Sequence, residues 1–125
     1  MFKKDNLETP PDKVNTVVGK GTKFKGILES TGLVRIDGEV DGTLVNKGDV
    51  IIGESGRVTA ELKARNVTIA GYYEGQLTAE GKLELKRTAS AAGSFKTNGL
   101  LVEDGATIAG AMEMKLKEQQ AATKS

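Results

Sequence analysis

The chain has 125 residues, enough for one domain, and 18 Lys and Arg against 17 Asp and Glu give a net charge of +1. This near balance argues against nucleic acid as a partner, because nucleic-acid binders usually have a strongly basic face. The chain contains no Cys and no His. It therefore cannot form disulfides or thiolate metal sites, and it lacks the commonest general base.

The first 15 residues are polar and include both prolines of the chain, so we expect residues 1–15 to form a flexible tail. The tip of this tail combines two apolar residues with two lysines, a composition suited to binding an anionic membrane surface. These candidate membrane-binding residues are Met1, Phe2, Lys3 and Lys4. An ordinary start of translation is the alternative. The opening lacks the apolar core of a signal peptide and no membrane-spanning run follows, so we expect a cytoplasmic location.

From residue 16 to residue 112, apolar and small residues recur in six units of 16 to 18 residues. One column ends an apolar strand in each unit: Val18, Ile36, Ile52, Ile69, Leu85 and Val102. A second follows the next turn: Phe24, Val40, Val58, Tyr73, Ala91 and Ile108. A small residue comes two positions later: Gly26, Gly42, Ala60, Gly75, Gly93 and Gly110. Two further columns are Leu28, Leu44, Leu62, Leu77, Phe95 and Met112, and Val34, Val50, Val67, Leu83 and Leu100.

Within each unit the apolar residues alternate with polar ones, which indicates strands with one buried face and excludes a helical repeat. Unit length changes only at the corners between strands, as in a solenoid whose coils stack in register. We therefore predict an all-β fold, a single-stranded β-helix of about six coils whose end coils lie about 24 Å apart. An antiparallel sandwich with evenly spaced strands is the alternative.

No motif in the chain predicts catalysis. The sequence GKGT at residues 19–22 lacks the first glycine of a phosphate loop. The acidic residues Asp37, Asp41, Asp49 and Glu54 lie at or near corners, where carboxylates usually only solvate a turn. Solenoid acyltransferases repeat every six residues and use a histidine, and this chain has neither feature. We therefore expect no enzyme and no cofactor. A solenoid enzyme or a monomeric ligand-binding module remains the alternative.

Residues 113–125 have helix-forming composition but no apolar stripe and no cap signal, so a flexible C-terminal tail is expected. The three segments of the chain are thus a tail at 1–15, a β-helix at 16–112 and a tail at 113–125.

These features resemble the bactofilin family. The resemblance rests on the Gly, Val and Ile columns, the sequence VEDGATIAG near the C-terminus, and the opening MFKK. It implies a right-handed β-helix that assembles without nucleotide into non-polar filaments, by stacking of its coil ends. It further implies attachment to the inner face of the cytoplasmic membrane through the N-terminal tail. Positioning of cell-wall enzymes or other machinery, with a role in cell shape, is implied as well. Ile108 stands where the family often has phenylalanine.

The ends of the predicted β-helix independently favour a polymer. A terminal coil exposes unpaired backbone groups and open core columns, and solenoids normally cover them with polar caps. Here apolar column residues reach both ends of the repeat. The predicted polymerisation interface comprises Val18, Phe24, Leu28, Leu100, Val102, Ile108 and Met112. In the alternative, the tails fold back as caps, with MKLKEQQ over the last coil.

Overall fold

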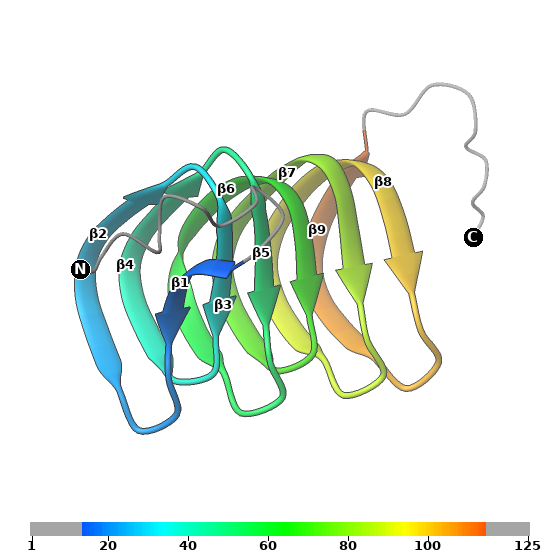
Figure 1. Ribbon diagram of the computed structural model, residues 1–125. Helices are drawn as coiled ribbons and strands as arrows, with labels where there is room; N and C mark the ends of the chain where they lie inside the picture. Colours follow the sequence, from blue (N-terminus) through cyan, green and yellow to red (C-terminus); the bar gives the residue numbers. More distant parts are fainter. Residues whose placement is uncertain (1–13, 115–125) are drawn as a thin grey trace, which may run out of the picture.

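The computed structural model describes residues 14–114, and these form one continuous β-solenoid (Figure 1). The nine strands of these residues belong to a single sheet, and they pair in parallel throughout it. The strands are β1 (Val14–Val18), β2 (Lys23–Ser30), β3 (Leu33–Ile36), β4 (Glu39–Asn46), β5 (Asp49–Ile52), β6 (Arg57–Ile69), β7 (Tyr72–Leu85), β8 (Ser90–Val102) and β9 (Thr107–Met114). This confirms the predicted all-β solenoid of about six coils, since a sandwich would pair its strands antiparallel.

The strand register confirms the columns predicted from the sequence. The first column is aligned as Val18, Ile36, Ile52, Ile69, Leu85 and Val102. The Phe24 and Leu28 columns are aligned through all six coils in the same way. Each residue therefore lies beside its column neighbours about 4.8 Å away in the adjacent coils.

Alternation along the strands places the columns inside the rod. In β6, every second residue from Val58 to Ala64 is buried, and the residues between them are exposed. Ile52 and Ile69, at the centre of their column, are fully buried. Burial of a side chain of this size stabilises the fold by roughly 1.5–3 kcal/mol. The stacked columns thus form one continuous apolar core along the rod axis.

The column of small residues marks a bend where neighbouring backbones approach closely. Gly26, Gly42, Gly75, Gly93 and Gly110 all have positive φ, from 116° to 139°. A Cβ on Gly93 would collide with the carbonyl oxygen of Gly75, one coil below. Both the conformation and the space at this bend therefore favour glycine.

Corners of two lengths occur at the foot of the rod (Figure 1). Four long corners are turns closed by a hydrogen bond from the fourth residue's N–H to the first residue's carbonyl oxygen. These turns are Gly19–Thr22, Gly53–Gly56, Lys86–Ala89 and Glu103–Ala106. The second and fourth coils have short corners instead, at Asp37–Gly38 and Ala70–Gly71. The long turns project beyond the short ones, as Figure 1 shows.

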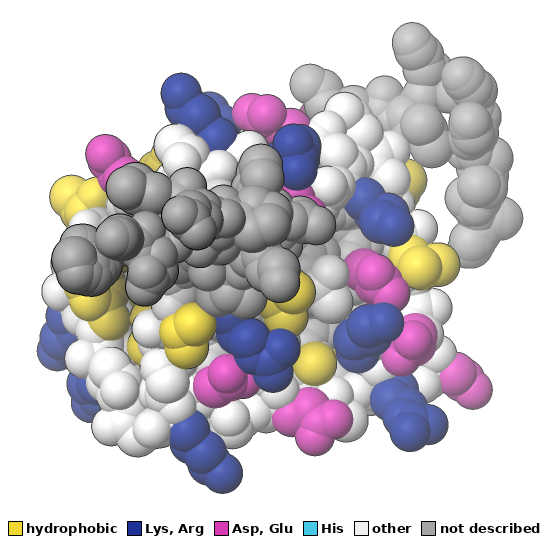
Figure 2. Space-filling view, viewed as in Figure 1, with side chains coloured by type: hydrophobic (Ala, Val, Ile, Leu, Met, Phe, Trp, Pro, Cys, Tyr) yellow, Lys and Arg dark blue, Asp and Glu magenta, His cyan; other side chains and the backbone are white. Residues whose placement is uncertain are grey.

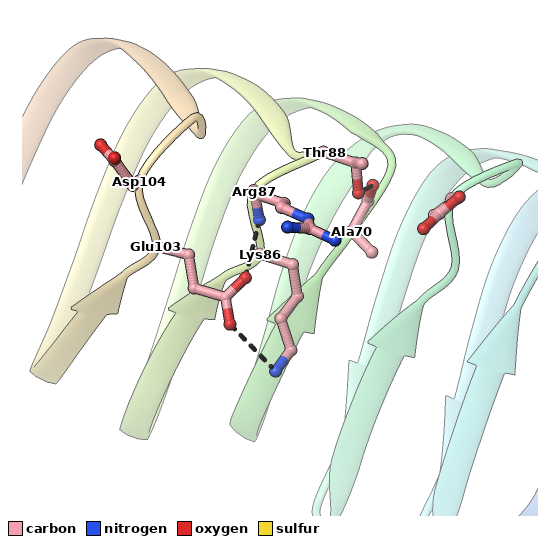
Figure 3. A pocket seen from close by; sticks show the side chains of 7 residues that line it. Ala70, Lys86, Arg87, Thr88, Glu103 and Asp104 are labelled. Carbon is pink, nitrogen blue, oxygen red and sulfur yellow. Dashed lines mark hydrogen bonds and ion pairs between the residues drawn. The ribbon is translucent and has the colours of Figure 1, made fainter.

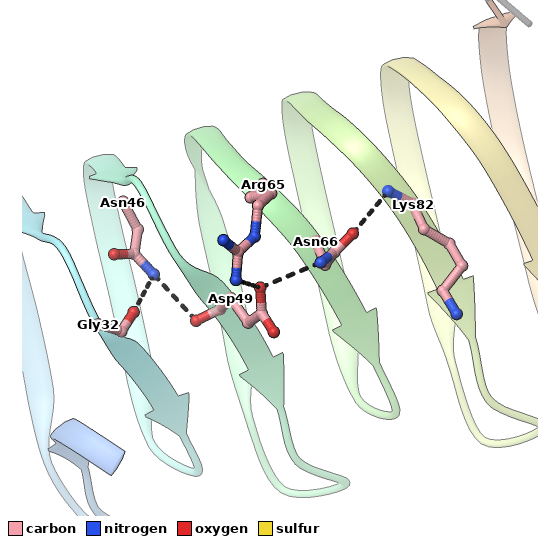
Figure 4. Close-up of polar contacts among 6 residues, drawn as sticks. All are labelled: Gly32, Asn46, Asp49, Arg65, Asn66 and Lys82. Atoms are coloured by element: carbon pink, nitrogen blue, oxygen red, sulfur yellow. Dashed lines mark hydrogen bonds and ion pairs between the residues drawn. The ribbon is translucent and has the colours of Figure 1, made fainter. Parts of the chain in front are cut away.

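A second corner contains polar side chains that the repeat pattern did not predict. Asn46 is 3% exposed, and its Nδ2 donates to the carbonyl oxygens of Gly32, at 2.8 Å, and Asp49, at 2.9 Å (Figure 4). Asn66 Nδ2 donates to Asp49 Oδ1 at 3.2 Å, and Asn66 Oδ1 accepts from the Lys82 backbone N–H at 2.9 Å. These side chains replace ladder hydrogen bonds where the backbone turns.

Tyr73 is the one phenol in the described core, and it is fully buried. Its hydroxyl lies 2.7 Å from the Ala60 carbonyl oxygen and 2.5 Å from that of Gln76. Burial raises the pKa of the Tyr73 phenol, so the hydroxyl remains protonated and donates to one carbonyl at a time. Its ring also packs against Phe95 at 6.1 Å between centroids.

Replacement of a bend glycine tests the account of the small column. We expect Gly93→Ala to lower the free energy of unfolding by about 2 kcal/mol or more, because it combines a positive φ of 127° with a backbone collision. Gly19→Ala is the matched control, since a Cβ there meets no described atom within 4 Å. Urea unfolding followed by circular dichroism measures both. Equal losses in the two variants would contradict the account.

Candidate assembly interface

The two ends of the rod expose strand edges that the interior coils do not. Within residues 14–114, β1 pairs only with β3, and β2 pairs only with β4. At the other end β9 pairs only with β8, and the last part of β8 has a neighbour on one side, in β7. Each end therefore presents N–H and C=O groups that a further parallel or antiparallel strand would satisfy.

The C-terminal end combines such an edge with exposed apolar side chains. Val102 is 45% exposed, whereas Leu85, its column neighbour one coil earlier, is fully buried. Ile108 is 40% exposed, whereas its neighbour Ala91 is 3% exposed. Leu100 and Met112 are half-buried and pack against the core. The core columns therefore continue to this surface without a covering layer in the described residues.

The N-terminal end is less open. Phe24 and Leu28 are half-buried and pack against the core, and Val18 is only 7% exposed. The seven residues predicted for the interface thus lie in two groups, three on the first coil and four on the last. The structure does not bring them together within one subunit, and it leaves the C-terminal group more accessible.

Outward-facing apolar residues at the ends were not identified in the sequence. Val17 is 59% exposed, Ile27 is 70% exposed and Leu101 is 49% exposed. Val17 and Leu101 occupy the same outward row, which contains Arg35, Ile51, Thr68 and Glu84 in the coils between them. The sequence did hold one sign of them, because this outward row is apolar in both end coils. These residues extend the apolar surface from the core to the rim of each end.

The end coils carry opposite charges. Exposed lysines, Lys20, Lys23 and Lys25, lie in the first coil with one carboxylate, Glu29. The last coil has only carboxylates from Leu100 to Met114, namely Glu103, Asp104 and Glu113. Along the rod, by contrast, both signs are interspersed on the face shown in Figure 2.

The acidic residues considered as catalytic candidates have structural contacts or lie apart. Asp37 accepts two hydrogen bonds from Arg35, at 3.0 and 3.3 Å. Asp49 Oδ1 accepts from Arg65 and Asn66, each at 3.2 Å. Among the described residues no group of three or more Asp or Glu side chains is placed to hold a metal ion.

The candidate membrane-binding residues Met1, Phe2, Lys3 and Lys4 lie outside the described residues, as do most of the two predicted tails. No helix between residues 14 and 114 is long and apolar enough to cross a membrane.

A family model named Bactofilin and described as polymer-forming cytoskeletal matches residues 16–113. The chain is 33% identical over 105 residues to bactofilin BacO of Myxococcus xanthus, covering 84% of this chain and 83% of that protein. It is 29% identical over 100 residues to bactofilin BacP of the same organism, covering 80% of this chain but only 42% of BacP.

Two solved structures of the Thermus thermophilus bactofilin have the same fold. The crystal structure of a point mutant superposes with a TM-score of 0.67 at 40% identity, covering 70% of this chain and 98% of that one. A cryo-EM reconstruction of double helical filaments superposes with a TM-score of 0.66 at 35% identity, covering 83% of this chain and 94% of that one.

Proposed function

Because this chain belongs to the bactofilin family of polymer-forming cytoskeletal proteins, we propose that it assembles end to end into filaments without nucleotide. The main support for this proposal comes from the C-terminal coil, where exposed Val102 and Ile108 lie beside an unpaired strand edge. Contact with another coil would satisfy the backbone groups and bury apolar area worth about 25 cal/mol per Å². The filaments formed by the Thermus relative support the same role here.

The filaments of the proposal are non-polar, so that like ends meet. The difference between the two ends supports this arrangement. Two C-terminal ends bring together the exposed Val102 and Ile108 of both subunits, whereas at the opposite end Val18 is already buried. A two-fold contact of this kind is isologous, and the remaining N-terminal ends then meet in the same way. The arrangement also places Glu103, Asp104 and Glu113 of two subunits near one another.

The proposed filaments lie on the inner face of the cytoplasmic membrane and position cell-wall enzymes or other machinery. The tail tip supports the membrane contact through Met1 and Phe2, which can enter the acyl boundary, and through Lys3 and Lys4, which favour anionic lipid. Each lysine contributes about 1 kcal/mol near such a surface. A single tail binds weakly, but many tails on one rigid filament bind together, because each later contact is effectively intramolecular.

An arginine at the C-terminal end tests the assembly interface. We expect Ile108→Arg to abolish filaments, because an unpaired charge in a dry contact costs roughly 3 kcal/mol or more. Thr59→Arg, at an exposed outward position of the third coil, is the matched control and should assemble normally. Electron microscopy and pelleting without ATP or GTP measure assembly, and circular dichroism confirms folding. Normal filaments from folded Ile108→Arg would show that this end is not part of the interface. A requirement for ATP or GTP in the unmodified protein would contradict assembly without nucleotide.

The effect of salt on assembly tests the polarity of the filament. If like ends meet, added salt screens the repulsion between the acidic C-terminal coils. The critical protein concentration for assembly should therefore fall as NaCl is raised from 0.05 to 0.3 M, over which the Debye length shortens by roughly threefold or less. Light scattering against protein concentration measures it. A critical concentration that rises with salt would instead indicate head-to-tail contact between the basic first coil and the acidic last coil.

Removal of the tail tip tests membrane attachment. We expect deletion of residues 1–4 to leave polymerisation intact but to release filaments from anionic liposomes in a flotation assay. The unassembled Ile108→Arg protein, with an intact tail, should also fail to float, because it lacks the multivalency of the filament. Equal flotation of that protein and of filaments would show that one tail is a strong anchor by itself.

A further inference from the structure

The last part of β8 has an open edge whose free backbone groups can be identified. One coil earlier, the Leu85 carbonyl oxygen accepts a hydrogen bond from the Glu103 N–H of the following coil. Val102 lies in the same column as Leu85, so its N–H and C=O face the side away from β7. Backbone groups alternate in direction along a strand, so those of Leu100 face the same open side and those of Leu101 face β7.

The sequence that follows β9 is in position to cover this open edge. Strand β9 is offset from β8 by 17 residues, up to the pair of Thr97 with Met114. The same offset beyond Met114 sets Gln119 against Val102. Residues 116–120, with the sequence LKEQQ, therefore have the length and the place of one further strand in the stack.

We propose that residues 116–120 form a covering strand, which lies parallel to the open edge of β8 and occupies part of the C-terminal end. In this pairing the Glu118 N–H donates to the Leu100 carbonyl oxygen, and the Val102 N–H donates to that of Glu118. The Gln120 N–H donates to the Val102 carbonyl oxygen, as the N–H groups at this position do between the interior coils. Backbone groups left free in the described residues are thereby satisfied within the same chain.

The side chains of the covering strand suit the end of an apolar core. Lys117 lies over Leu100, where its methylene stem covers apolar surface while its amine reaches water. Gln119 lies over Val102, which is 45% exposed in the described structure. A register shifted by one residue would instead place the carboxylate of Glu118 over Leu100. Polar residues over the core columns are also what terminal repeats of solenoids need for solubility.

The charges of the last coil favour the same contact. Residues 100–114 carry only carboxylates, whereas residues 115–125 contain three lysines and one glutamate. Glu103 Oε2 is already 3.6 Å from Lys86 Nζ, but Asp104 points away from both and makes no ion pair with another described residue (Figure 3). Exposed pairs are weak singly, and here the attraction between the basic segment and the acidic coil adds to the ladder hydrogen bonds.

The covering strand competes with a second subunit for the C-terminal end, an inference that rests on the end-to-end stacking proposed above. It covers Val102, through which two C-terminal ends would meet, but it leaves Ile108 and the rest of β9 open. Subunits can therefore join only after the strand has left the edge of β8. Because only the fraction of subunits with a free edge associates, the apparent affinity falls by that fraction. The strand thus sets the concentration at which filaments form.

Amide hydrogen exchange in monomeric protein tests the contact itself, without filaments. The full chain is kept monomeric by Ile108→Arg or by dilution, and sedimentation checks its state. A strand docked about nine-tenths of the time should slow exchange of the Leu100 and Val102 amides about tenfold, relative to protein lacking residues 115–125. The Leu101 amide faces β7 and should exchange alike in both proteins. Equal exchange of the Val102 amide in both would overturn the proposal.

Proline substitutions at adjacent positions test the pairing. Glu118→Pro removes an N–H that the covering strand donates to β8. Gln119→Pro removes one that points away from β8, where an edge strand tolerates proline, and its ring still covers Val102. Exchange of the Val102 amide should therefore speed up in Glu118→Pro and stay slow in Gln119→Pro. Any other combination of results would contradict this pairing.

Filament assembly by protein with the natural Ile108 tests the competition. Deletion of residues 115–125 should lower the critical concentration by about tenfold, since the same docked fraction governs exchange and association. Glu118→Pro should lower it in the same direction. A critical concentration that deletion leaves unchanged or raises would overturn the competition. Absence of filaments from every protein, with the Val102 amide still protected in the full chain, would contradict the proposed function and not the covering strand.

Discussion

The structure depends on one constraint, the hydrogen bonding of each coil to the coils on either side of it. Strand pairs such as Ile36 with Ile52 join successive coils, and no strand of the described residues closes the sheet on itself. The stacking interaction itself sets no limit on the number of coils that can be added. Its two ends expose the same groups that every interior coil has satisfied, so the polymer proposed for this bactofilin extends the interaction that already holds the subunit together.

The division between core and surface follows from this stacking. Core columns must keep their apolar character, because each member packs on its neighbours above and below. The corners face solvent and can vary in length, as the short corner at Asp37 and the long turn at Glu54 show. The corners are therefore where one coil of the rod differs most from the next. The long turns hold their charges rigidly because hydrogen bonds such as that of Ser55 to Asp37 tie them to the preceding coil.

The sequence predicted the core well because every second residue of a strand is buried, and because equivalent positions of successive coils stack in one column. The sequence did not reveal the inward position shared by Ser30, Asn46, Ala79 and Thr97, since its members differ in polarity. Asn46 and Thr97 donate to local carbonyl oxygens, whereas Ala79 packs in the core. It also gave no measure of how open each end is. Val18 and Val102 occupy the same column, yet they are 7% and 45% exposed. The charged residues of the turns were visible in the sequence, but only the turn hydrogen bonds showed which of them project.

Amide hydrogen exchange at the last coil tests the central claim most directly. In unassembled protein, the amides of β9 should exchange faster than those of β7, which has neighbours on both sides. On assembly, exchange in Thr107–Met114 should slow by about tenfold or more, whereas exchange in β7 should change little. Unchanged exchange throughout β9 in assembled protein would show that the open edge of the rod is not the surface through which the subunits join.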